Sequence, residues 1–407
     1  MESYGCTMNY GEGEQLSAEM AALGHEESFS AESAEIVILN TCTVVDITEK
    51  KMIARMAELK KEGKQVIVTG CMAKVQSDRV LIRLPDSLVI PPDRYSEFPK
   101  EISQRYGNGP AVCETRSSNI LPISMGCLGD CAYCITKFAR GSLKSYDPES
   151  LVSRFDSLVG NGIKEILVTA QDTGCYGSDI GTDLPSLLGM MLKNKNEFRI
   201  RIGMMNPNSL IPILDDLLEV MKDPRIYRFL HIPVQSGSNP ILKRMNRYYT
   251  AWEFFLLVNK IRSVYPELSI STDLITGFPG ETNDDHKMSM ELLETLRADT
   301  VNITRFSPRP GTEAAVMRGQ VHGRISKDRS TELTVLRNKI EYENNIMLIG
   351  RRMGALITEN GKEGTMIART DNYRQVVIVT DKPIGTFVNI EITGCKPAYL
   401  IGRVVKG

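Results

Sequence analysis

Apolar and polar residues alternate in blocks along the first part of the chain. Two short apolar runs, residues 35–40 and 65–69, have the length of buried strands, and residues 12–23 and 46–61 have the spacing of helices. Ser3 and Tyr4 are expected to be the end of another strand. This order predicts βαβ units that form a parallel sheet, in which ligand sites gather at the carboxyl ends of the strands.

A second set of strand-like runs follows, with helical segments between its members. These runs are residues 121–125, 165–169, 199–204, 229–233, 268–274 and 300–306. Each run ends in polar or glycine-rich residues. Six such units predict a (βα)6 partial barrel with its active site at the C-terminal mouth of the strands. We expect a connecting helix after it, at residues 332–345.

Short strand-like runs separated by turn residues fill the end of the chain. They are residues 354–358, 364–368, 375–380, 387–392 and 400–405, and they predict a small β-barrel. Proline and glycine recur within residues 91–110, which we interpret as a linker. The predicted fold class is α/β, with an N-terminal parallel-sheet α/β domain at residues 1–110. A central (βα)6 partial barrel is expected at residues 111–345 and a small OB-like β-barrel at residues 346–407.

Composition and charge narrow the class of protein only slightly. The chain is 42% hydrophobic and 24% charged with a formal net charge of -1, which is ordinary for a globular protein. Its first residues lack the basic and apolar regions of a signal peptide, and no apolar run has membrane-spanning length. We therefore expect a cytoplasmic protein without membrane attachment. The first strand is very short, so either the true N-terminus lies upstream of Met1 or the edge strand is frayed.

Three cysteines follow the first strand of the expected barrel at the spacing CxxxCxxC. They are Cys127, Cys131 and Cys134. Three thiolates this close favour a soft metal, most naturally an iron-sulfur cluster. Because a cubane cluster has four irons, three protein ligands leave one iron open to a small molecule. The alternative is a zinc site that lacks one ligand.

Three other cysteines each follow a strand of the N-terminal sheet. Cys6, Cys42 and Cys71 are far apart in sequence, but parallel strands bring their carboxyl ends to one edge of the sheet. The pattern therefore predicts a second three-thiolate metal site. The alternative for Cys42 and Cys71 is that they are small buried hydrophobes. The remaining cysteines fit no spacing pattern and are expected to be structural: Cys113, Cys175 and Cys395.

The CxxxCxxC motif, with Tyr133 before its third cysteine, resembles the signature of radical S-adenosylmethionine enzymes. In that family the open iron chelates the amino and carboxylate groups of the cofactor, and the aromatic residue lies near its adenine. The cysteine motifs at residues 5–9, 40–42 and 70–72 resemble the N-terminal domain of the methylthiotransferases, which are transferases of alkylthio groups. The C-terminal barrel resembles the TRAM domain that binds tRNA in this family.

Residues 126–141 and 203–207 are most similar to the archaeal and eukaryotic branch of the methylthiotransferases. That branch converts N6-threonylcarbamoyladenosine at position 37 of tRNA to its 2-methylthio derivative. The resemblance implies two 4Fe-4S clusters, S-adenosyl-L-methionine, an ANN-decoding anticodon loop, an unidentified electron donor and a sulfur source. The nearest alternative substrate is N6-isopentenyladenosine, and a ribosomal protein is a more distant one. An alternative of another class is a non-enzymatic tRNA-binding protein with structural metal.

Polar residues at the ends of the barrel strands suit a cofactor that carries ribose, amine, carboxylate and sulfonium groups. The candidates for cofactor binding, besides Tyr133, are Gln171, Asp172, Gln235 and Asp273. The alternative is that such residues only cap turns. His231 is expected to be a barrel histidine whose hydrogen bonds are satisfied.

Two features bear on RNA. Residues 351–407 hold nine Lys/Arg and five Asp/Glu, a net charge of +4, whereas residues 1–110 hold twelve and seventeen, a net charge of -5. The basic end is compatible with nucleic acid. Residues 243–249 mix cations with tyrosines, which is typical of an RNA contact and equally of a solvated helix end.

The mechanism implied by the family uses S-adenosylmethionine twice. One molecule gives its methyl group to sulfur held at the N-terminal cluster. Another is reductively cleaved at the cluster of Cys127, Cys131 and Cys134, and the resulting radical opens the adenine C2-H to sulfur insertion.

Overall fold

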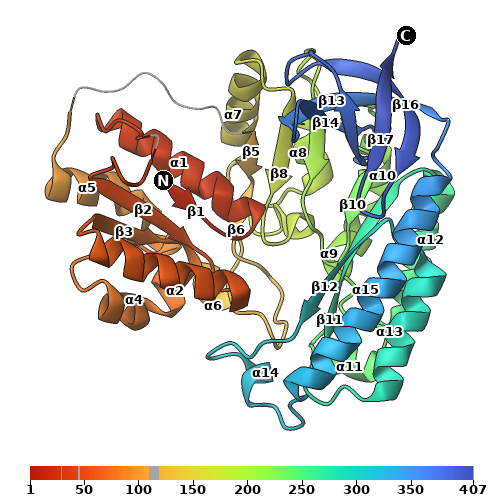
Figure 1. Cartoon of the computed structure of the whole chain (residues 1–407), viewed down its shortest axis with the longest axis horizontal. Coiled ribbons are helices and arrows are strands. Elements are labelled where there is room, and N and C mark those ends of the chain that lie inside the picture. Colours follow the sequence, from red (N-terminus) through yellow and green to blue (C-terminus); the bar gives the residue numbers. More distant parts are fainter. Residues whose placement is uncertain (29, 45, 110–118, 407) are drawn as a thin grey trace.

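A computed structural model describes residues 1–28, 30–44, 46–109 and 119–406, which form three units (Figure 1). The N-terminal unit has a four-stranded parallel sheet in the order β1-β2-β3-β4. Its strands are β1 Glu2–Ser3, β2 Ile36–Thr41, β3 Gln65–Thr69 and β4 Leu88–Val89. Its helices are α1 Thr7–Ala22, α2 Asp46–Lys61, α3 Gly70–Val75, α4 Ser77–Arg83 and α5 Phe98–Tyr106. The expected parallel α/β unit is confirmed.

Helix α1 begins directly after Cys6, five residues before the predicted start. The prediction was wrong because Gly11 and Gly13 disfavour a helix by propensity alone. Tertiary packing overrides that propensity. A Cβ at Gly11 would lie 2.6 Å from Ile120, and one at Gly13 would lie 2.0 Å from Ser3 Oγ. Both glycines let α1 approach neighbouring strands closely.

The proline-rich segment predicted as a linker, residues 91–110, is structured over most of its length. A 3-10 helix, η1 Pro92–Glu97, leads into α5, and a proline lies in the first turn of each. Proline at that position costs no hydrogen bond. Phe98 and Ile102 lie four positions apart on one helix face and are fully buried in the N-terminal core. The linker prediction was therefore wrong for residues 92–106.

The central unit is a partial barrel of six parallel strands, as predicted. The strands are β5 Ile120–Pro122, β8 Glu165–Thr169, β9 Arg199–Ile202, β10 Phe229–His231, β11 Ser269–Thr276 and β12 Thr300–Arg305. They pair as β5-β8-β9 and β10-β11-β12, and a parallel bridge between Met204 and His231 joins the two groups. A large apolar core fills the space between strands and helices.

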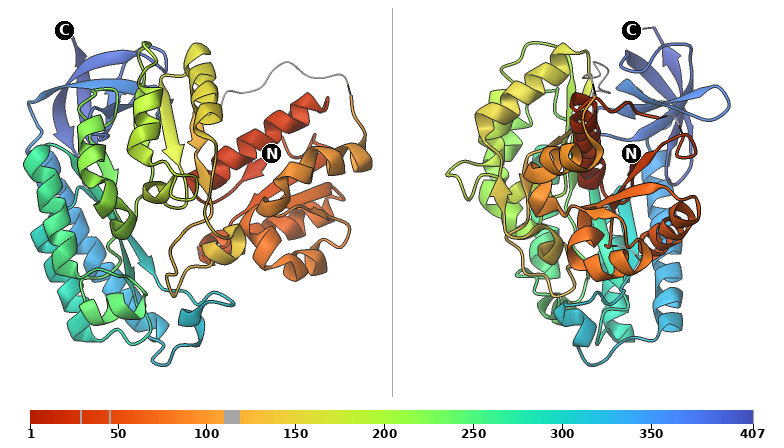
Figure 2. Two further views of the ribbon diagram at one scale, coloured as in Figure 1. Left: turned by 180° about the vertical axis from the view of Figure 1, so that it is seen from behind. Right: turned by 90° about the vertical axis from the view of Figure 1, so that its left-hand side faces the viewer.

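Helices cover the outside of this partial barrel (Figure 2). The main ones are α7 Pro148–Gly160, α8 Leu184–Met191, α10 Leu214–Val220, α12 Ala251–Val264, α13 Asn283–Leu296 and α15 Gly323–Ile346. Helix α15 contains the connecting helix expected at residues 332–345 and starts nine residues earlier. Short elements lie between the barrel strands: β6 Ser124–Met125, α6 Thr136–Arg140, β7 Lys144–Ser145, α9 Pro207–Leu210 and α11 Asn239–Arg244. Another short helix, α14 Glu313–Val316, follows the last barrel strand.

The C-terminal unit is a closed five-stranded barrel in the order β13-β14-β15-β17-β16. Its strands are β13 Arg352–Asn360, β14 Thr365–Thr370, β15 Gln375–Val379, β16 Phe387–Cys395 and β17 Leu400–Val405. Alternate residues point inward and form a separate core that includes Ile357, Val376 and Ile390. The predicted small barrel is confirmed.

The small barrel is attached where the strands of the central barrel begin. Asp371 pairs with Arg199 at 3.0 Å, and Arg374 pairs with Asp299. Tyr373 packs on Tyr227 and Phe229, with ring centroids 4.8 and 5.0 Å away. The small barrel is therefore fixed at the end of the central barrel opposite its C-terminal mouth (Figure 1).

None of the helices in the described ranges is long and apolar enough to cross a membrane.

Candidate functional site

The three N-terminal cysteines lie at the carboxyl edge of their sheet, as the sequence predicts. Cys6 lies between β1 and α1, Cys42 directly follows β2, and Cys71 is the second residue of α3. Gly5 has a φ of +109°, and a Cβ there would lie 2.6 Å from Cys42 Sγ. Although Cys6 reaches solvent, protein atoms around its thiol raise the pKa of Cys6, and the Cys71 charge raises it further. The chain folds these three thiols into one neighbourhood.

Gly70 allows the loop that carries Cys42 and the loop that carries Cys71 to lie close together. Its φ is +79°, and a Cβ would lie 2.2 Å from the Thr41 carbonyl oxygen. Thr41 and Gly70 form a parallel bridge that extends the β2-β3 ladder to the residues beside Cys42 and Cys71. Only glycine combines this left-handed backbone with such a close contact.

Arg140 enters the N-terminal cysteine group from the barrel. It is the last residue of α6, the short helix that begins two residues after Cys134. Its side chain is buried, and its Nε lies 3.4 Å from Cys71 Sγ. Its other nitrogens donate to Asn9 Oδ1 at 2.8 Å and to Glu12. Burial lowers the pKa of Arg140, but the charges of Cys71 and Glu12 raise it more, so the guanidinium is charged. No sequence pattern indicates this contact.

The barrel cysteines lie on the loop between β6 and α6. Gly129 donates its N–H to Cys127 Sγ at 3.2 Å. A Cβ on Gly129 would be 3.3 Å from Cys127 Sγ and 3.9 Å from Cys131 Sγ, so this glycine lies between the two sulfurs. The Cys134 N–H donates to the Cys131 carbonyl at 3.0 Å. Burial raises the pKa of Cys134, and the Cys131 charge adds to the rise. The loop thus folds its three thiols together.

Tyr133 and Gln171 hold this loop on the barrel. The Tyr133 ring meets Phe278 edge to face with centroids 6.3 Å apart, and burial raises the pKa of Tyr133 far above its usual value. Gln171 Oε1 accepts the Gly126 N–H at 2.7 Å. Both residues therefore lie beside the cysteine loop, and Gln171 already uses one acceptor to fix its start.

Cys175, which was expected to be structural, is a neighbour of the barrel cysteines. Its thiol contacts the carbonyl oxygen of Asp172 at 3.1 Å. A hydrogen bond with Cys175 lowers the pKa of Cys127, and the same bond raises the pKa of Cys175. The only available signal was its place after β8, at the mouth of the barrel. Cys395 lies far away on β16, and Cys113 is outside the described residues.

Arg247 was also missed, because its segment resembled an RNA contact. The guanidinium is buried, and its Nη1 donates to Cys131 Sγ at 3.3 Å. Its other nitrogens donate to the Pro233 carbonyl and the Tyr249 hydroxyl, each at 2.8 Å. Tyr248 is exposed and donates to Asp130 Oδ2 at 2.6 Å. Arg247 and Tyr248 therefore hold the cysteine loop, whereas Lys243 and Arg244 of the same segment are exposed.

The carboxylate of Asp172 is fully engaged by the surrounding loops. It accepts hydrogen bonds from Ser209 Oγ at 2.8 Å and from the N–H groups of Gly174 and Asn206 at 3.1 Å. Burial raises the pKa of Asp172 more than these bonds lower it. Asp172 thus has the turn-capping geometry that was the alternative to cofactor contact.

Gln235, unlike Asp172, has a buried acceptor that no hydrogen bond uses in the described part of the chain. Its φ is +72°, in the left-handed region that glutamine rarely adopts, and its Oε1 is buried without a partner among the described residues. Backbone strain of this kind costs about 1–3 kcal/mol and concentrates at ligand sites. Gln235 N–H donates to the Asp273 carbonyl at 2.8 Å, which places the two candidates side by side. The mouth therefore offers an unused acceptor.

Asp273 joins three neighbouring strands at the mouth. Its Oδ1 lies 2.8 Å from His231 Nε2 and accepts from Asn302 Nδ2 at 2.8 Å. The second carboxylate oxygen has no such bond among the contacts of the described residues. His231 therefore has a hydrogen-bond partner, as expected for a barrel histidine.

These donor sets fit the groups that the sequence implies. Each three-cysteine group consists of soft sulfur ligands beside a buried arginine, which suits an anionic iron-sulfur cluster. The unpaired Gln235 Oε1 suits a donor such as the amino group of a small cofactor. In the described ranges, no three His, Cys, Asp or Glu side chains converge around a point that would hold a single metal ion.

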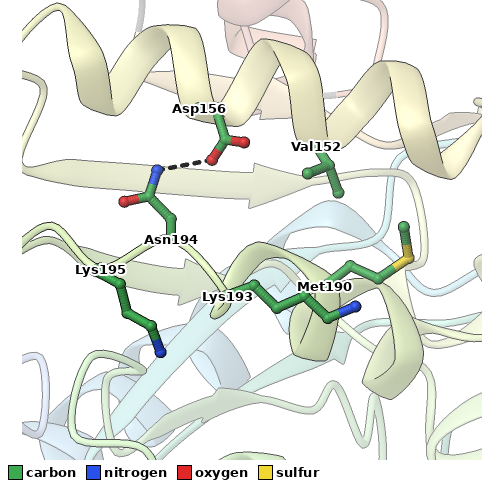
Figure 3. Close-up of a pocket in the computed structure, with 6 residues that line it drawn as sticks. All are labelled: Val152, Asp156, Met190, Lys193, Asn194 and Lys195. Atoms are coloured by element: carbon green, nitrogen blue, oxygen red, sulfur yellow. Dashed lines mark hydrogen bonds between the residues drawn. The ribbon is translucent and has the colours of Figure 1, made fainter.

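A separate cavity of about 540 Å³ lies between α7 and α8 and is lined by Val152, Asp156, Met190, Lys193, Asn194 and Lys195 (Figure 3). Asn194 donates to Asp156 at 2.7 Å across it. It contains none of the cysteines or mouth residues, so it is not part of the site.

Comparisons with known proteins agree with this architecture. The chain matches the model of Uncharacterized protein family UPF0004 at residues 1–90, the Radical SAM superfamily at residues 121–293 and the TRAM domain at residues 348–405. Its fold is similar to a radical S-adenosylmethionine methyltransferase from Kitasatospora setae, solved with cobalamin and a 4Fe-4S cluster bound. The TM-score is 0.55 at 14% identity, over 75% of this chain and 69% of that one. The class of protein is therefore a radical S-adenosylmethionine protein with a TRAM domain.

Curated relatives define the family more closely. The chain is 42% identical to the probable threonylcarbamoyladenosine tRNA methylthiotransferase of Pyrococcus abyssi, over 100% of this chain and 99% of that protein. It is 32% identical to the human threonylcarbamoyladenosine tRNA methylthiotransferase, over 100% of this chain and 73% of the human protein. The chain belongs to the threonylcarbamoyladenosine tRNA methylthiotransferase family.

Proposed function

We propose that this chain converts N6-threonylcarbamoyladenosine at position 37 of tRNA to its 2-methylthio derivative. The observation that supports this most is the pair of three-cysteine groups, connected by α6 and each in contact with a buried arginine. A single structural metal site requires neither two groups nor a strained, unpaired residue at the mouth. The N6-isopentenyladenosine alternative is less well supported, because the relatives named above carry the threonylcarbamoyladenosine name.

In the barrel, Cys127, Cys131 and Cys134 would hold one 4Fe-4S cluster and leave its fourth iron for S-adenosyl-L-methionine. When bound, that pair supplies a carbon-centred radical for removal of a substrate hydrogen. Tyr133 closes the loop against Phe278, and Gln171 fixes the start of the loop. We assign Gln235 and Asp273 to direct cofactor contact because each has a free acceptor, and Asp172 to positioning of the loops.

In the N-terminal domain, Cys6, Cys42 and Cys71 would hold the second 4Fe-4S cluster, which would carry the sulfur to be methylated. We propose a division of labour among residues 1–110 for this cluster, residues 111–345 for radical chemistry and residues 346–407 for tRNA binding. The base at position 37 is unpaired in its loop, so no duplex must be opened.

The partners follow from the same proposal. The tRNA would be one with an ANN-decoding anticodon loop, and the protein would act in the cytoplasm. An electron donor is required for cofactor cleavage, and a sulfur source must replace the sulfur that each turnover consumes.

Nucleoside mass spectrometry of tRNA from cells with and without this protein tests the proposal. The 2-methylthio derivative of N6-threonylcarbamoyladenosine should disappear without the protein. Loss of a methylthiolated isopentenyladenosine instead would favour the alternative base.

A variant with Cys6, Cys42 and Cys71 all changed to Ala separates the two clusters. It should lose roughly half of the iron and all methylthiolation, while it still cleaves S-adenosylmethionine, because the barrel ligands remain. Full iron and intact product would show that these cysteines only pack. A colourless, zinc-loaded protein purified without air would favour the non-enzymatic alternative.

A further inference from the structure

Each of the two cysteine groups contacts one buried arginine supplied by another segment of the chain. Arg140 lies 3.4 Å from Cys71 Sγ, and Arg247 lies 3.3 Å from Cys131 Sγ. The two arginine residues are 3% and 7% exposed. Both distances are within the range of an N–H donor on sulfur, and neither arginine belongs to a cysteine motif.

The two arginines differ in how their charge is compensated. Arg140 forms an ion pair with Glu12, whose side chain is also buried. Arg247 has no carboxylate within ion-pair distance in the part of the chain that the structure describes, and its remaining partners are the neutral Pro233 carbonyl and Tyr249 hydroxyl. A buried cation without a counter-charge costs several kcal/mol. The compensating negative charge for Arg247 is therefore to be found at the Cys131 sulfur.

We propose that Arg247 and Arg140 are the counter-charges of the barrel cluster and the N-terminal cluster, respectively, and that each raises the reduction potential of its own cluster. This inference rests on the proposed function. Reduction adds one negative charge to a cluster, and a fixed cation nearby stabilises that charge. Hydrogen bonds to cluster sulfurs act in the same direction. Both arginines are positioning residues, since they act through the cysteines.

The geometry also ranks the two effects. Arg247 presents its whole charge to one cysteine sulfur, whereas the Glu12 carboxylate offsets part of the Arg140 charge. Removal of Arg247 should therefore change the barrel cluster more than removal of Arg140 changes the N-terminal cluster. The effects should also be separable, because each arginine contacts sulfur in only one group among the described contacts.

The test uses the full chain with one cluster at a time. Replacement of Cys6, Cys42 and Cys71 with Ala leaves the barrel cluster, and the corresponding barrel triple variant leaves the N-terminal cluster. The fraction of reduced cluster is read by electron paramagnetic resonance at a series of fixed potentials. In the first background, Arg247→Met should lower the ratio of reduced to oxidised cluster at least tenfold at a given potential, which is about 59 mV for one electron. Arg247→Lys should change it less than threefold.

Arg140 needs a different design, because its loss alone would leave Glu12 as a lone buried carboxylate. We compare Glu12→Gln with the double variant Arg140→Met, Glu12→Gln, both in the barrel triple variant. The double variant should have a lower ratio of reduced to oxidised cluster than Glu12→Gln, by a factor smaller than that of Arg247. In this background Arg247→Met should leave the ratio within twofold.

Three results would overturn the inference. The first is a barrel cluster in Arg247→Met whose ratio of reduced to oxidised cluster stays within twofold of the parent. The second is a change of either arginine that shifts this ratio equally for both clusters. The third is loss of iron from Arg247→Lys as well as from Arg247→Met. Iron retained by the Lys variant but lost from the Met variant would support it, since the two differ in charge. Absence of a cluster from either parent background would instead contradict the proposed function, so the two failures are distinguishable.

Discussion

Arg309 donates a 2.8 Å hydrogen bond to Glu49, which joins the loop after β12 to the N-terminal domain. Both side chains are less than a tenth exposed. Glu49 Oε2 also accepts from Thr43 at 2.9 Å and Gln76 at 3.1 Å. Because Thr43 and Gln76 flank the cysteine loops, this pair holds the N-terminal cysteine group against the barrel.

Removal of Arg309 should therefore destabilise the chain strongly. Arg309→Met leaves the Glu49 carboxylate buried and short of a partner, which costs about 3–5 kcal/mol. Arg79 bonds the same carboxylate but is 45% exposed, so Arg79→Met is a matched control that should cost about 1 kcal/mol or less. Guanidinium unfolding measures both. Equal losses in the two variants would contradict a special role for the buried pair.

The same carboxylate makes stability depend on acid pH. Burial alone would raise the pKa of Glu49, but hydrogen bonds from Gln76, Thr43 and Arg79, together with the Arg309 charge, lower it. Its folded pKa is then below its unfolded value of about 4.3, so its contribution is present above that pH and is lost as pH falls through the folded pKa. In Glu49→Gln, the free energy of unfolding should depend less steeply on pH than in the parent below about pH 4.5. A slope identical to that of the parent would disprove the prediction.

Gly70→Ala should disrupt the N-terminal cysteine group. The added Cβ would lie 2.2 Å from the Thr41 carbonyl oxygen at a φ of +79°, so the backbone must shift beside Cys71. We expect loss of about half of the iron per chain. Gly63→Ala is the control, because Gly63 has a φ of +66° but nothing within 4 Å of its Cβ position. That variant should cost about 1–2 kcal/mol of stability and keep its iron.

Cys127 and Cys175 should form a disulfide in iron-free protein treated with diamide. Each thiol shifts the pKa of the other, which places the two sulfurs side by side before oxidation. Each thiol loses one hydrogen, and diamide is reduced to its hydrazide. Peptide mass spectrometry should find the Cys127–Cys175 link in the parent and not in Cys175→Ser. Cys395→Ser is the control, because Cys395 lies far away on β16, and this variant should still form the Cys127–Cys175 link.

Sequence patterns predicted the architecture well because the strands and their order depend on local spacing. The neighbourhood of Cys6, Cys42 and Cys71 could be expected only because a parallel sheet brings the carboxyl ends of its strands to one edge. Helix α1 was predicted too short, because Gly11 and Gly13 allow close packing against Ile120 and Ser3 that becomes visible only in the fold. The proline-rich segment was misassigned for the same reason, because Phe98 shows its importance only once it is buried.

The roles of the arginines in the site could not be predicted from the sequence. Arg140, Arg247 and Arg309 act over separations of 69, 116 and 260 residues, respectively. An arginine in a polar segment has the composition of a solvated or RNA-binding surface until its burial is known. Glutamine at a positive φ, as at Gln235, is equally invisible in a sequence.

The attachment of the small barrel at the start of the central strands sets a minimum length for an RNA that would contact both the small barrel and the cysteine loop, as the proposed function requires. Asp371 and Arg374 hold the small barrel at one end, and the cysteine loop lies past the other end. The eight residues of β11 alone separate the two by about 26 Å. An RNA that touches both must extend along the flank of the barrel over at least that length. A loop presented on a shorter stem would reach one contact or the other, so the enzyme would discriminate by length before any base is read.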